Sequence, residues 1–126
     1  MQTVWLVDDD LEMITAVQLM LKLLHYESRY FLSARLAAQA LMGGERPGAL
    51  ILDVSMTEVS GIDFLEFLRH RSEWKSLPVV MLSSEAADVQ VDVALGKGAD
   101  AYVTKPVSIE ELEDALKKAF QAHSES

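Results

Sequence analysis

Short apolar runs alternate along the chain with longer segments that carry helical spacing. All but one of these runs are apolar nearly throughout, which is typical of strands covered on both faces, as in a parallel sheet between two helix layers. Five βα units in sequence predict a doubly wound α/β domain. The expected strands are Thr3–Val7, Glu27–Phe31 (the weaker one), Ala49–Leu52, Pro78–Leu82 and Ala101–Val103. The expected helices are Leu11–His25, Ala34–Met42, Ile62–Arg71, Ala86–Lys97 and Ile109–Gln121.

Local signals define the last helix well and the first helix less well. Ser108 and Glu111 have the spacing of a capping box at the start of the last helix. In the first helix, apolar residues extend beyond a single stripe, so they either belong to the edge of the core or form a docking patch. The expected buried stripe is Leu11, Ile14, Val17, Leu21 and Leu24, and the additional apolar residues are Met13, Met20 and Leu23. The three histidines show no metal-ligand spacing and are expected at the surface: His25, His70 and His123.

Size and composition narrow the class of protein. The 126 residues fit one domain, expected to span residues 1–126 with a core from about residue 3 to residue 121. The chain has no cysteine, which excludes disulfides and cysteine-ligated metals and agrees with a reducing cytoplasm. No apolar run reaches the roughly 20 residues that span a membrane, and no signal peptide is expected. The net charge of −9 disfavours direct binding of DNA or RNA.

Polar and charged residues follow four of the five expected strands. In a parallel sheet, ligands bind at the carboxyl ends of the strands. Because the first and third strands are neighbours in the usual arrangement, Asp8, Asp9 and Asp53 are expected to lie together. The residues in question are Asp8, Asp9 and Asp10 after the first strand, Asp53 after the third, Ser83, Ser84 and Glu85 after the fourth, and Thr104, Lys105 and Pro106 after the fifth.

A cluster of carboxylates at this edge is expected to be destabilising unless one of them is protonated or a cation lies among them. Two carboxylates about 4 Å apart repel by roughly 4 kcal/mol at an effective dielectric of about 20. Oxygen ligands and partial access to water favour a hard divalent ion, Mg²⁺ before Ca²⁺. Asp10 is better placed to cap the first helix than to bind the metal. A carboxylate, a metal, the Ser83 hydroxyl and the Lys105 ammonium are together the groups that neutralise and orient a transferring phosphoryl group.

Four strings of residues, in this order and at this spacing, resemble the receiver domain of bacterial two-component response regulators, from Val4 to about Ala119. The resemblance implies a flavodoxin-like (βα)5 three-layer sandwich whose parallel strands lie in the order 2-1-3-4-5, in a cytoplasmic signalling module like the chemotaxis regulators. The strings are Leu6-Val7-Asp8-Asp9, Leu50-Ile51-Leu52-Asp53 followed by Met56 and Gly61, Pro78-Val79-Val80-Met81-Leu82-Ser83, and Gly98-Ala99-Asp100-Ala101-Tyr102 followed by Lys105-Pro106.

The same resemblance implies a role for each carboxylate. Asp53 is expected to accept a phosphoryl group from a histidine kinase or a histidine phosphotransfer protein. Asp9, Asp53 and the backbone carbonyl of Ser55 are expected to ligate Mg²⁺, with Asp8 acting largely through water. Lys105 is expected to pair with the resulting acyl phosphate.

The resemblance also implies a switch. Ser83 is expected to turn toward the phosphoryl group and Tyr102 to change its rotamer in concert, although an ordinary half-buried aromatic explains Tyr102 equally well. Phosphorylation is then expected to alter the surface formed by residues 86–96, the fifth strand and the last helix. The implied partners are the phosphodonor, an output partner or output domain, and a second copy in a phosphorylation-linked homodimer. Nucleic acid and membrane are not expected partners of this domain.

The chain departs from the family pattern behind the acceptor. Thr57 stands where the family usually has proline, which frees the loop and is expected to alter kinetics rather than abolish function. Ser83 replaces the more frequent threonine and keeps the hydroxyl. Ser55 and Glu85 flank the site, and the hypothesis is that they tune the attack of water on the acyl phosphate.

Three other functions compete with this interpretation. A magnesium-dependent phosphohydrolase of similar topology usually has a second aspartate two residues after its nucleophile, where this chain has Ser55, and a cap over the substrate. A flavin-binding module needs a first loop rich in hydroxyl and glycine residues, whereas this loop is rich in aspartate. A degenerate receiver used as a scaffold would not need the complete set of site residues. The sequence therefore favours a phosphoacceptor that is not a turnover enzyme.

Overall fold

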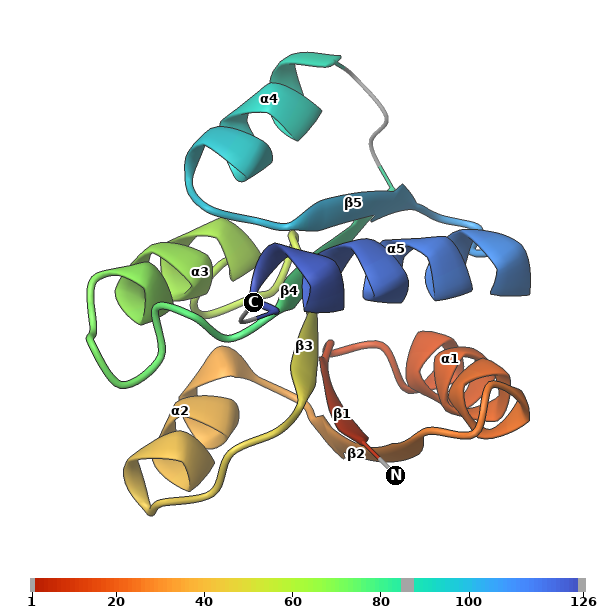
Figure 1. The fold of residues 1–126 in the computed structure, drawn as a ribbon, viewed down its shortest axis with the longest axis horizontal. Helices are drawn as coiled ribbons and strands as arrows, with labels where there is room; N and C mark the ends of the chain where they lie inside the picture. Colours follow the sequence, from red (N-terminus) through yellow and green to blue (C-terminus); the bar gives the residue numbers. More distant parts are fainter. Residues whose placement is uncertain (1, 85–87, 125–126) are drawn as a thin grey trace.

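The computed structural model describes residues 2–84 and 88–124, and its five strands form one parallel sheet in the order β2-β1-β3-β4-β5 (Figure 1). The doubly wound α/β fold predicted from the sequence, with its strand order, is confirmed. The strands are β1 (Thr3–Val7), β2 (Glu27–Phe31), β3 (Ala49–Asp53), β4 (Val79–Ser83) and β5 (Ala101–Thr104). The helices are α1 (Leu11–Leu23), α2 (Ala34–Met42), α3 (Gly61–Arg69), α4 (Asp88–Gly96) and α5 (Ile109–Ala122).

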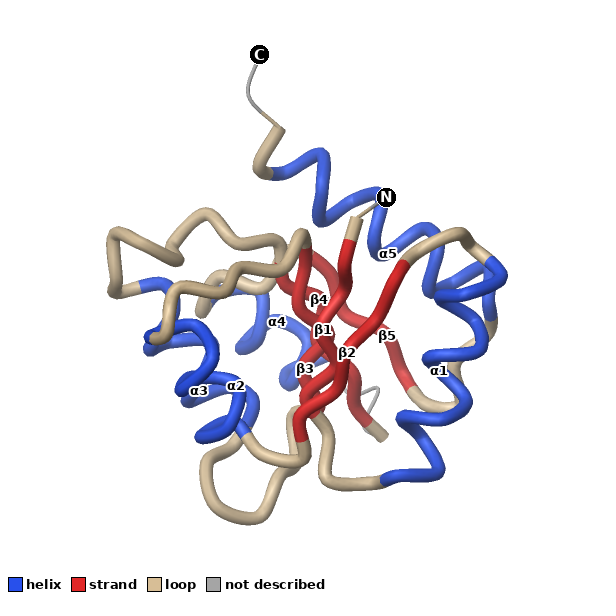
Figure 2. The backbone as a smooth tube through the Cα atoms, turned by 90° about the horizontal axis from the view of Figure 1, so that it is seen from below, coloured by secondary structure: helices blue, strands red, loops and turns tan. Residues whose placement is uncertain are grey.

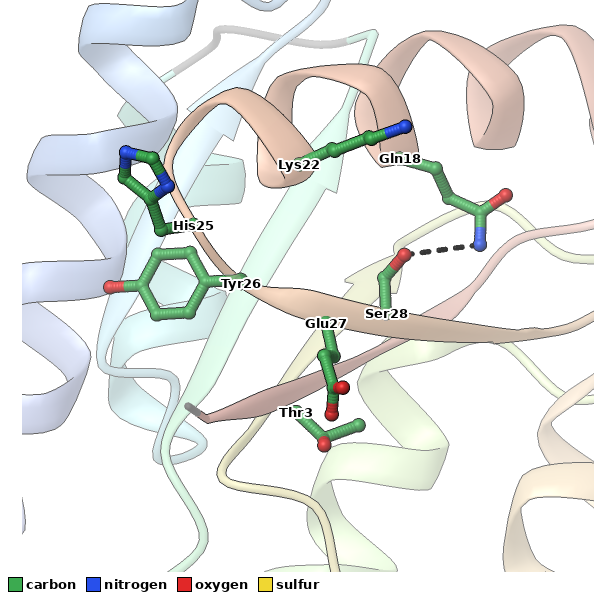
Figure 3. Close-up of a pocket in the computed structure, with 7 residues that line it drawn as sticks. All are labelled: Thr3, Gln18, Lys22, His25, Tyr26, Glu27 and Ser28. Atoms are coloured by element: carbon green, nitrogen blue, oxygen red, sulfur yellow. Dashed lines mark hydrogen bonds between the residues drawn. The ribbon is translucent and has the colours of Figure 1, made fainter.

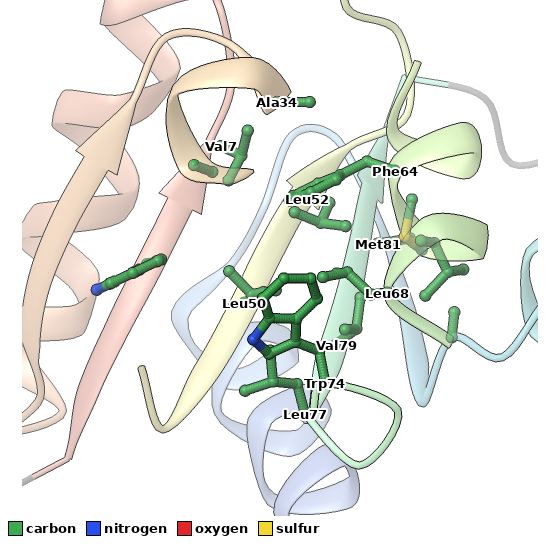
Figure 4. Close-up of a cluster of buried hydrophobic side chains, with 14 of the residues drawn as sticks. Val7, Ala34, Leu50, Leu52, Phe64, Leu68, Trp74, Leu77, Val79 and Met81 are labelled. Carbon is green, nitrogen blue, oxygen red and sulfur yellow. The ribbon is translucent and has the colours of Figure 1, made fainter. Parts of the chain in front are cut away.

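The helices cover both faces of the sheet, which is why β1, β3 and β4 are almost entirely apolar, unlike the edge strand β2. Helices α2, α3 and α4 pack on one face and helices α1 and α5 on the other, and Figure 2 shows α2 and α3 across the sheet from α1 and α5. On the first face, Leu50, Leu52 and Met81 from the central strands contact Phe64 and Leu68 of α3 (Figure 4). These strand residues are fully buried. Burial of this kind stabilises the fold by about 1.5–3 kcal/mol for each large apolar side chain.

The predicted boundaries agree with the structure to within two residues where both ends are described. Helix α1 ends at Leu23 rather than at His25, because His25 has a φ of 69° and the Tyr26 N–H turns back to the Leu21 carbonyl. The capping box of Ser108 and Glu111 is present at the start of α5. The predicted start of the fourth helix, Ala86, lies outside the described residues.

The outer face of α1 differs from the prediction. Ile14, Val17 and Leu21 are buried as expected, but Leu11 is 55% exposed, so its assignment to the buried stripe was wrong. Leu11 lies at the first helical position, where the chain has only just left the sheet edge. Met13 and Met20 are half-buried and pack against the core on this side, which supports the core-edge interpretation of the methionines. The exposed apolar residues of α1 are Leu11, Leu19 and Leu23.

A buried ion-pair network lies where β4 and β5 begin, at the end of the sheet opposite to Asp8 and Asp53. The Arg69 guanidinium lies 3.1 Å from the Asp100 carboxylate, and both side chains are about nine-tenths buried. Asp100 also accepts a hydrogen bond from the Val79 N–H at 2.8 Å. The His123 ring nitrogen lies 2.9 Å from both carboxylate oxygens of Asp100, and its side chain is only 21% exposed, so the prediction of a freely exposed surface histidine was wrong. His25 and His70 are exposed, as predicted.

Arg69 makes further hydrogen bonds that bind loops together. Its side chain donates to the carbonyl oxygens of Gly98 (2.9 Å) and Leu77 (2.7 Å), in the segments that precede β5 and β4. A buried guanidinium is tolerated only when its donors are satisfied, as they are here.

The described helices include none that is long and apolar enough to cross a membrane.

Candidate phosphoacceptor site

The carboxyl ends of four strands meet at one edge of the sheet and bring the predicted residues together. Asp8 directly follows β1, and its N–H donates to the Phe31 carbonyl at 3.1 Å. Asp53 and Ser83 are the last residues of β3 and β4, where Asp53 pairs in register with Leu82. Lys105 directly follows β5, and its N–H donates to the Ser83 carbonyl at 2.7 Å. Residues separated by almost the whole chain therefore share one site.

Three carboxylates form the centre of this site. Side-chain oxygens of Asp8, Asp9 and Asp53 lie within 4.8 Å of one another. Asp8 and Asp53 are each only 4% exposed, whereas Asp9 is exposed to solvent. Two buried carboxylates at this separation repel each other strongly unless a positive charge compensates them.

Lys105 supplies part of this compensation. Its Nζ lies 3.5 Å from Asp8 Oδ2 and 3.5 Å from Asp53 Oδ1, so one ammonium faces two carboxylates. The Lys105–Pro106 peptide bond is cis. Although Lys105 lies nearby, the buried Asp8 Oδ2 accepts no hydrogen bond. One ammonium against three carboxylates leaves a net negative charge and a buried carboxylate oxygen that accepts no hydrogen bond, and this set of oxygen donors suits a divalent cation.

The environment of Asp53 disfavours the ionised form of its carboxyl group. Burial, together with the negative charge of Asp8, raises the pKa of Asp53 to about 6. Lys105 and the Ser55 N–H, which lies 3.3 Å from Asp53 Oδ1, act in the opposite direction. Desolvation and repulsion therefore outweigh the two favourable contacts. A cation next to Asp53 would reverse this balance and keep the carboxylate ionised for nucleophilic attack.

Comparison with known proteins agrees with this geometry. The family model described as the response regulator receiver domain matches residues 4–117. The chain belongs to this family. Its sequence is 37% identical to that of the KDP operon transcriptional regulatory protein KdpE of Escherichia coli over 79 residues, which are 63% of this chain and 34% of the relative. It is 32% identical to the transcriptional regulatory protein KdpE of Mycobacterium tuberculosis over 126 residues, which are 98% of this chain and 53% of the relative.

A solved structure supports the same assignment. The chemotaxis protein CheY4 of Vibrio cholerae superimposes with a TM-score of 0.84 at 28% identity, covering 94% of this chain and 98% of that one. The receiver domain thus accounts for nearly all of CheY4, whereas it spans about a third to a half of the length of the two KdpE proteins. The chain is a receiver domain of the response regulators. The pocket formed by Asp8, Asp9 and Asp53, called the acidic pocket below, fits a phosphoacceptor site.

Three of the other residues considered in the sequence analysis, Ser83, Tyr102 and Asp10, lie within the described part of the chain. Ser83 is 2% exposed at the end of β4. Tyr102 is half-buried on β5 and packs against the cluster formed with α2 and α3, so it fits both interpretations given above. Asp10 caps α1, because its Oδ1 accepts the N–H groups of Glu12 and Met13, and this prediction is confirmed. Glu85 lies outside the described residues.

Gly61 holds the loop behind the acceptor close to β3. A Cβ atom at this position would lie 2.1 Å from the Asp53 carbonyl oxygen, so any larger residue must displace the backbone of the acceptor. In the same loop, the Thr57 N–H donates a hydrogen bond to Asp9 Oδ2 at 3.2 Å. The sequence did not indicate this contact, because every residue except proline offers the same N–H and nothing marks its acceptor.

A surface hollow at the opposite end of the sheet is unrelated to this site. It has a volume of about 620 Å³ and lies between α1 and the edge strand β2 (Figure 3). Gln18 Nε2 donates to Ser28 Oγ across it at 3.1 Å. Its lining residues are Thr3, Gln18, Lys22, His25, Tyr26, Glu27 and Ser28, and it shares none with the acidic pocket.

The raised pKa of Asp53 predicts a pH dependence of stability in the metal-free receiver domain. From about pH 4 to about pH 6, the unfolded chain loses the Asp53 proton while the folded chain retains it. The free energy of unfolding should therefore fall as pH rises through this window, by up to about 2–3 kcal/mol, and then level off. Urea unfolding in the presence of a chelator measures this change. Asp53→Asn should remove it, and an identical pH profile in both proteins would contradict the prediction.

Proposed function

We propose that Asp53 is the phosphoacceptor of this receiver domain. The observation that carries the proposal is the buried Asp53 carboxylate beside Asp8 and Asp9, with the Lys105 ammonium 3.5 Å away. The donor is the phosphohistidine of a histidine kinase or of a histidine phosphotransfer protein. An Asp53 oxygen forms a bond to phosphorus, the phosphorus–nitrogen bond breaks, and the imidazole leaves with its electron pair and takes up a proton.

Mg²⁺ is the proposed cation. The buried Asp8 Oδ2, which accepts no hydrogen bond, and the all-oxygen donor set fit a hard divalent ion. Asp9, Asp53 and the Ser55 carbonyl would hold it directly, and Asp8 through water. When bound, it supplies positive charge to the oxygens of the transferring group. Lys105 supplies a second positive charge from the protein and orients the same group from the β5 side.

The proposed consequence of phosphorylation is a switch at the surface of α4, β5 and α5. The acyl phosphate brings about −1.5 to −2 charges and strong acceptor oxygens to the ends of β3 and β4. Ser83 and Lys105 then gain acceptors that are absent from the unphosphorylated protein, which biases their strands toward a second arrangement, with Tyr102 moving in concert. The output is an output domain, a partner protein, or a second copy in a homodimer. As a receiver, the domain is expected to act in the cytoplasm, where its phosphodonor is found.

The domain is proposed to carry a phosphoryl group transiently rather than to turn over substrates. Ser55 occupies the place at which a phosphohydrolase of similar topology has its second aspartate. The test is incubation of the wild-type protein with Mg²⁺ and acetyl phosphate, followed by intact mass measurement. The expected result is one added phosphoryl group that requires Mg²⁺ and is lost on standing. Steady hydrolysis of many phosphate esters would indicate an enzyme, and no addition would refute the proposal.

The outer face of α1 is the proposed docking surface for the phosphodonor protein. Leu11, Leu19 and Leu23 are 55–61% exposed, and the helix that carries them begins directly after Asp10, in the loop that also carries Asp8 and Asp9. Apolar side chains spaced one or two turns apart along a helix can fit between the helices of a partner.

A double substitution tests this surface. Leu19→Asn with Leu23→Asn should slow phosphotransfer from a phosphorylated histidine phosphotransfer protein by at least about tenfold, because full burial of a leucine side chain is worth about 1.5–3 kcal/mol and about 1.4 kcal/mol already corresponds to a factor of ten. Phosphorylation by acetyl phosphate should be unchanged. Met42→Asn, at an equally exposed residue (59%) on α2, is the matched control. Equal slowing with both donors would argue against docking at α1.

A further inference from the structure

The loop that follows β3 reaches across the acidic pocket to the loop that follows β1. The backbone N–H of Thr57 donates to Asp9 Oδ2 at 3.2 Å, between residues 48 positions apart in the chain. The bond uses the main chain of Thr57, and both residues are exposed to solvent. It therefore joins the two loops that carry the proposed cation ligands, Asp9 on one side and Ser55 on the other.

Asp9 needs such a donor more than its neighbours do. The carboxylates of Asp8 and Asp53 are enclosed by the sheet edge, and each is 4% exposed. The Asp9 side chain can instead rotate into water, and the negative charges of Asp8 and Asp53 push it in that direction. An N–H donor that meets Asp9 Oδ2 opposes this repulsion and removes rotamer freedom that cation binding would otherwise have to remove.

The hydrogen bond leaves Asp9 able to bind a cation. An ionised carboxylate offers about four lone-pair sites on its two oxygens, and the Thr57 N–H occupies only one of them. With this bond in place, oxygens of all three carboxylates lie within 4.8 Å of one another. A donor that orients a metal ligand without touching the metal commonly changes the affinity of a site by 10–100-fold.

We propose that the Thr57 backbone N–H is a positioning group for Asp9, which holds this carboxylate in the acidic pocket before a cation arrives and thereby raises the affinity for Mg²⁺. The inference deepens the proposed function and rests on it for the identity of the cation. Its chemistry is specific to the main chain, because every residue except proline can supply the same donor. The threonine side chain has no part in it.

Two substitutions at one position separate the main chain from the side chain. Thr57→Ala keeps the N–H and removes the side chain, whereas Thr57→Pro removes the N–H. Nuclear magnetic resonance titration of each protein with MgCl₂ measures the affinity. The expected result is wild-type affinity for Thr57→Ala and roughly tenfold weaker binding for Thr57→Pro. Wild-type affinity in both variants, or equal weakening in both, would overturn the inference.

Two further measurements guard against a general disturbance of the loop by proline, which also restricts Met56. In an Asp9→Ala background, Thr57→Pro should cause no additional loss of Mg²⁺ affinity, because the two groups act through one bond. The Thr57 amide hydrogen should exchange with solvent more slowly in the metal-free wild type than in Asp9→Ala. An additional loss in the double variant, or equal exchange rates, would also overturn the inference.

The titrations distinguish failure of the inference from failure of the proposed function. If the wild-type protein binds no Mg²⁺ at all, both the proposed cation site and the role of Thr57 are refuted. If it binds Mg²⁺ and accepts a phosphoryl group while Thr57→Pro binds with unchanged affinity, only the role of Thr57 is refuted.

Discussion

Asp53→Asn is expected to abolish the uptake of a phosphoryl group from acetyl phosphate. An amide oxygen carries no full negative charge and is a poor nucleophile, while asparagine keeps the size and shape of the side chain. The fold should survive, because the substitution removes one of two mutually repelling buried carboxylates. Intact mass measurement after incubation with Mg²⁺ and acetyl phosphate should show the added group on the wild-type protein and none on the variant.

The control for this result is an aspartate of the same charge outside the pocket. Asp114, which is exposed on α5, serves this purpose, and Asp114→Asn should take up the phosphoryl group like the wild type. Asp9→Asn should bind Mg²⁺ more weakly and react more slowly, since it keeps the nucleophile but loses a proposed ligand. A phosphoryl group that remains on Asp53→Asn would place the acceptor elsewhere in the chain.

Arg69→Ala is expected to lower the free energy of unfolding by about 3–5 kcal/mol, the cost of leaving a buried charge without its partner. Asp100 would lose the guanidinium that lies 3.1 Å away, while its carboxylate remained about nine-tenths buried. The carbonyl oxygens of Gly98 and Leu77 would lose a donor as well. Urea unfolding followed by circular dichroism measures the difference. Because a small domain is stable by about 5–15 kcal/mol, the loss is a large fraction of the total.

The matched control is an arginine whose ion pair is exposed. Arg35 lies 3.9 Å from Glu58, and both side chains are more than half exposed. Arg35→Ala should therefore change the free energy of unfolding by less than about 1 kcal/mol. Equal losses for the two arginines would show that burial of the Asp100 network contributes nothing to stability.

Much of the fold could be predicted from local pattern. Strands β1, β3 and β4 are apolar on both faces, and this burial pattern appears directly in the residue types. Ser108 and Glu111 mark the start of α5, because a capping box is made within one turn of the chain. The end of α1 was less predictable, since His25 adopts a left-handed conformation that neither its residue type nor its neighbours require.

The candidate site was predictable for a related reason. Asp8, Asp53, Ser83 and Lys105 each end or directly follow a strand, and parallel strands place all such ends at one edge of the sheet. A correct strand order was therefore enough to bring them together. The burial of Leu11 and the position of His123 were predicted wrongly, because both depend on where a helix end meets the rest of the molecule.

The sequence by itself shows that Asp53 ends a buried strand and that charged residues follow the neighbouring strands. Because the ends of parallel strands lie at one edge of the sheet, this is enough to predict the site. Only the tertiary structure reveals that Asp8 Oδ2 lacks a hydrogen-bond partner, that Arg69 binds Asp100, and that the Thr57 N–H reaches Asp9. The physical reason is that each of these depends on distances of a few ångströms between loops far apart in the chain, which no local pattern of residue types records.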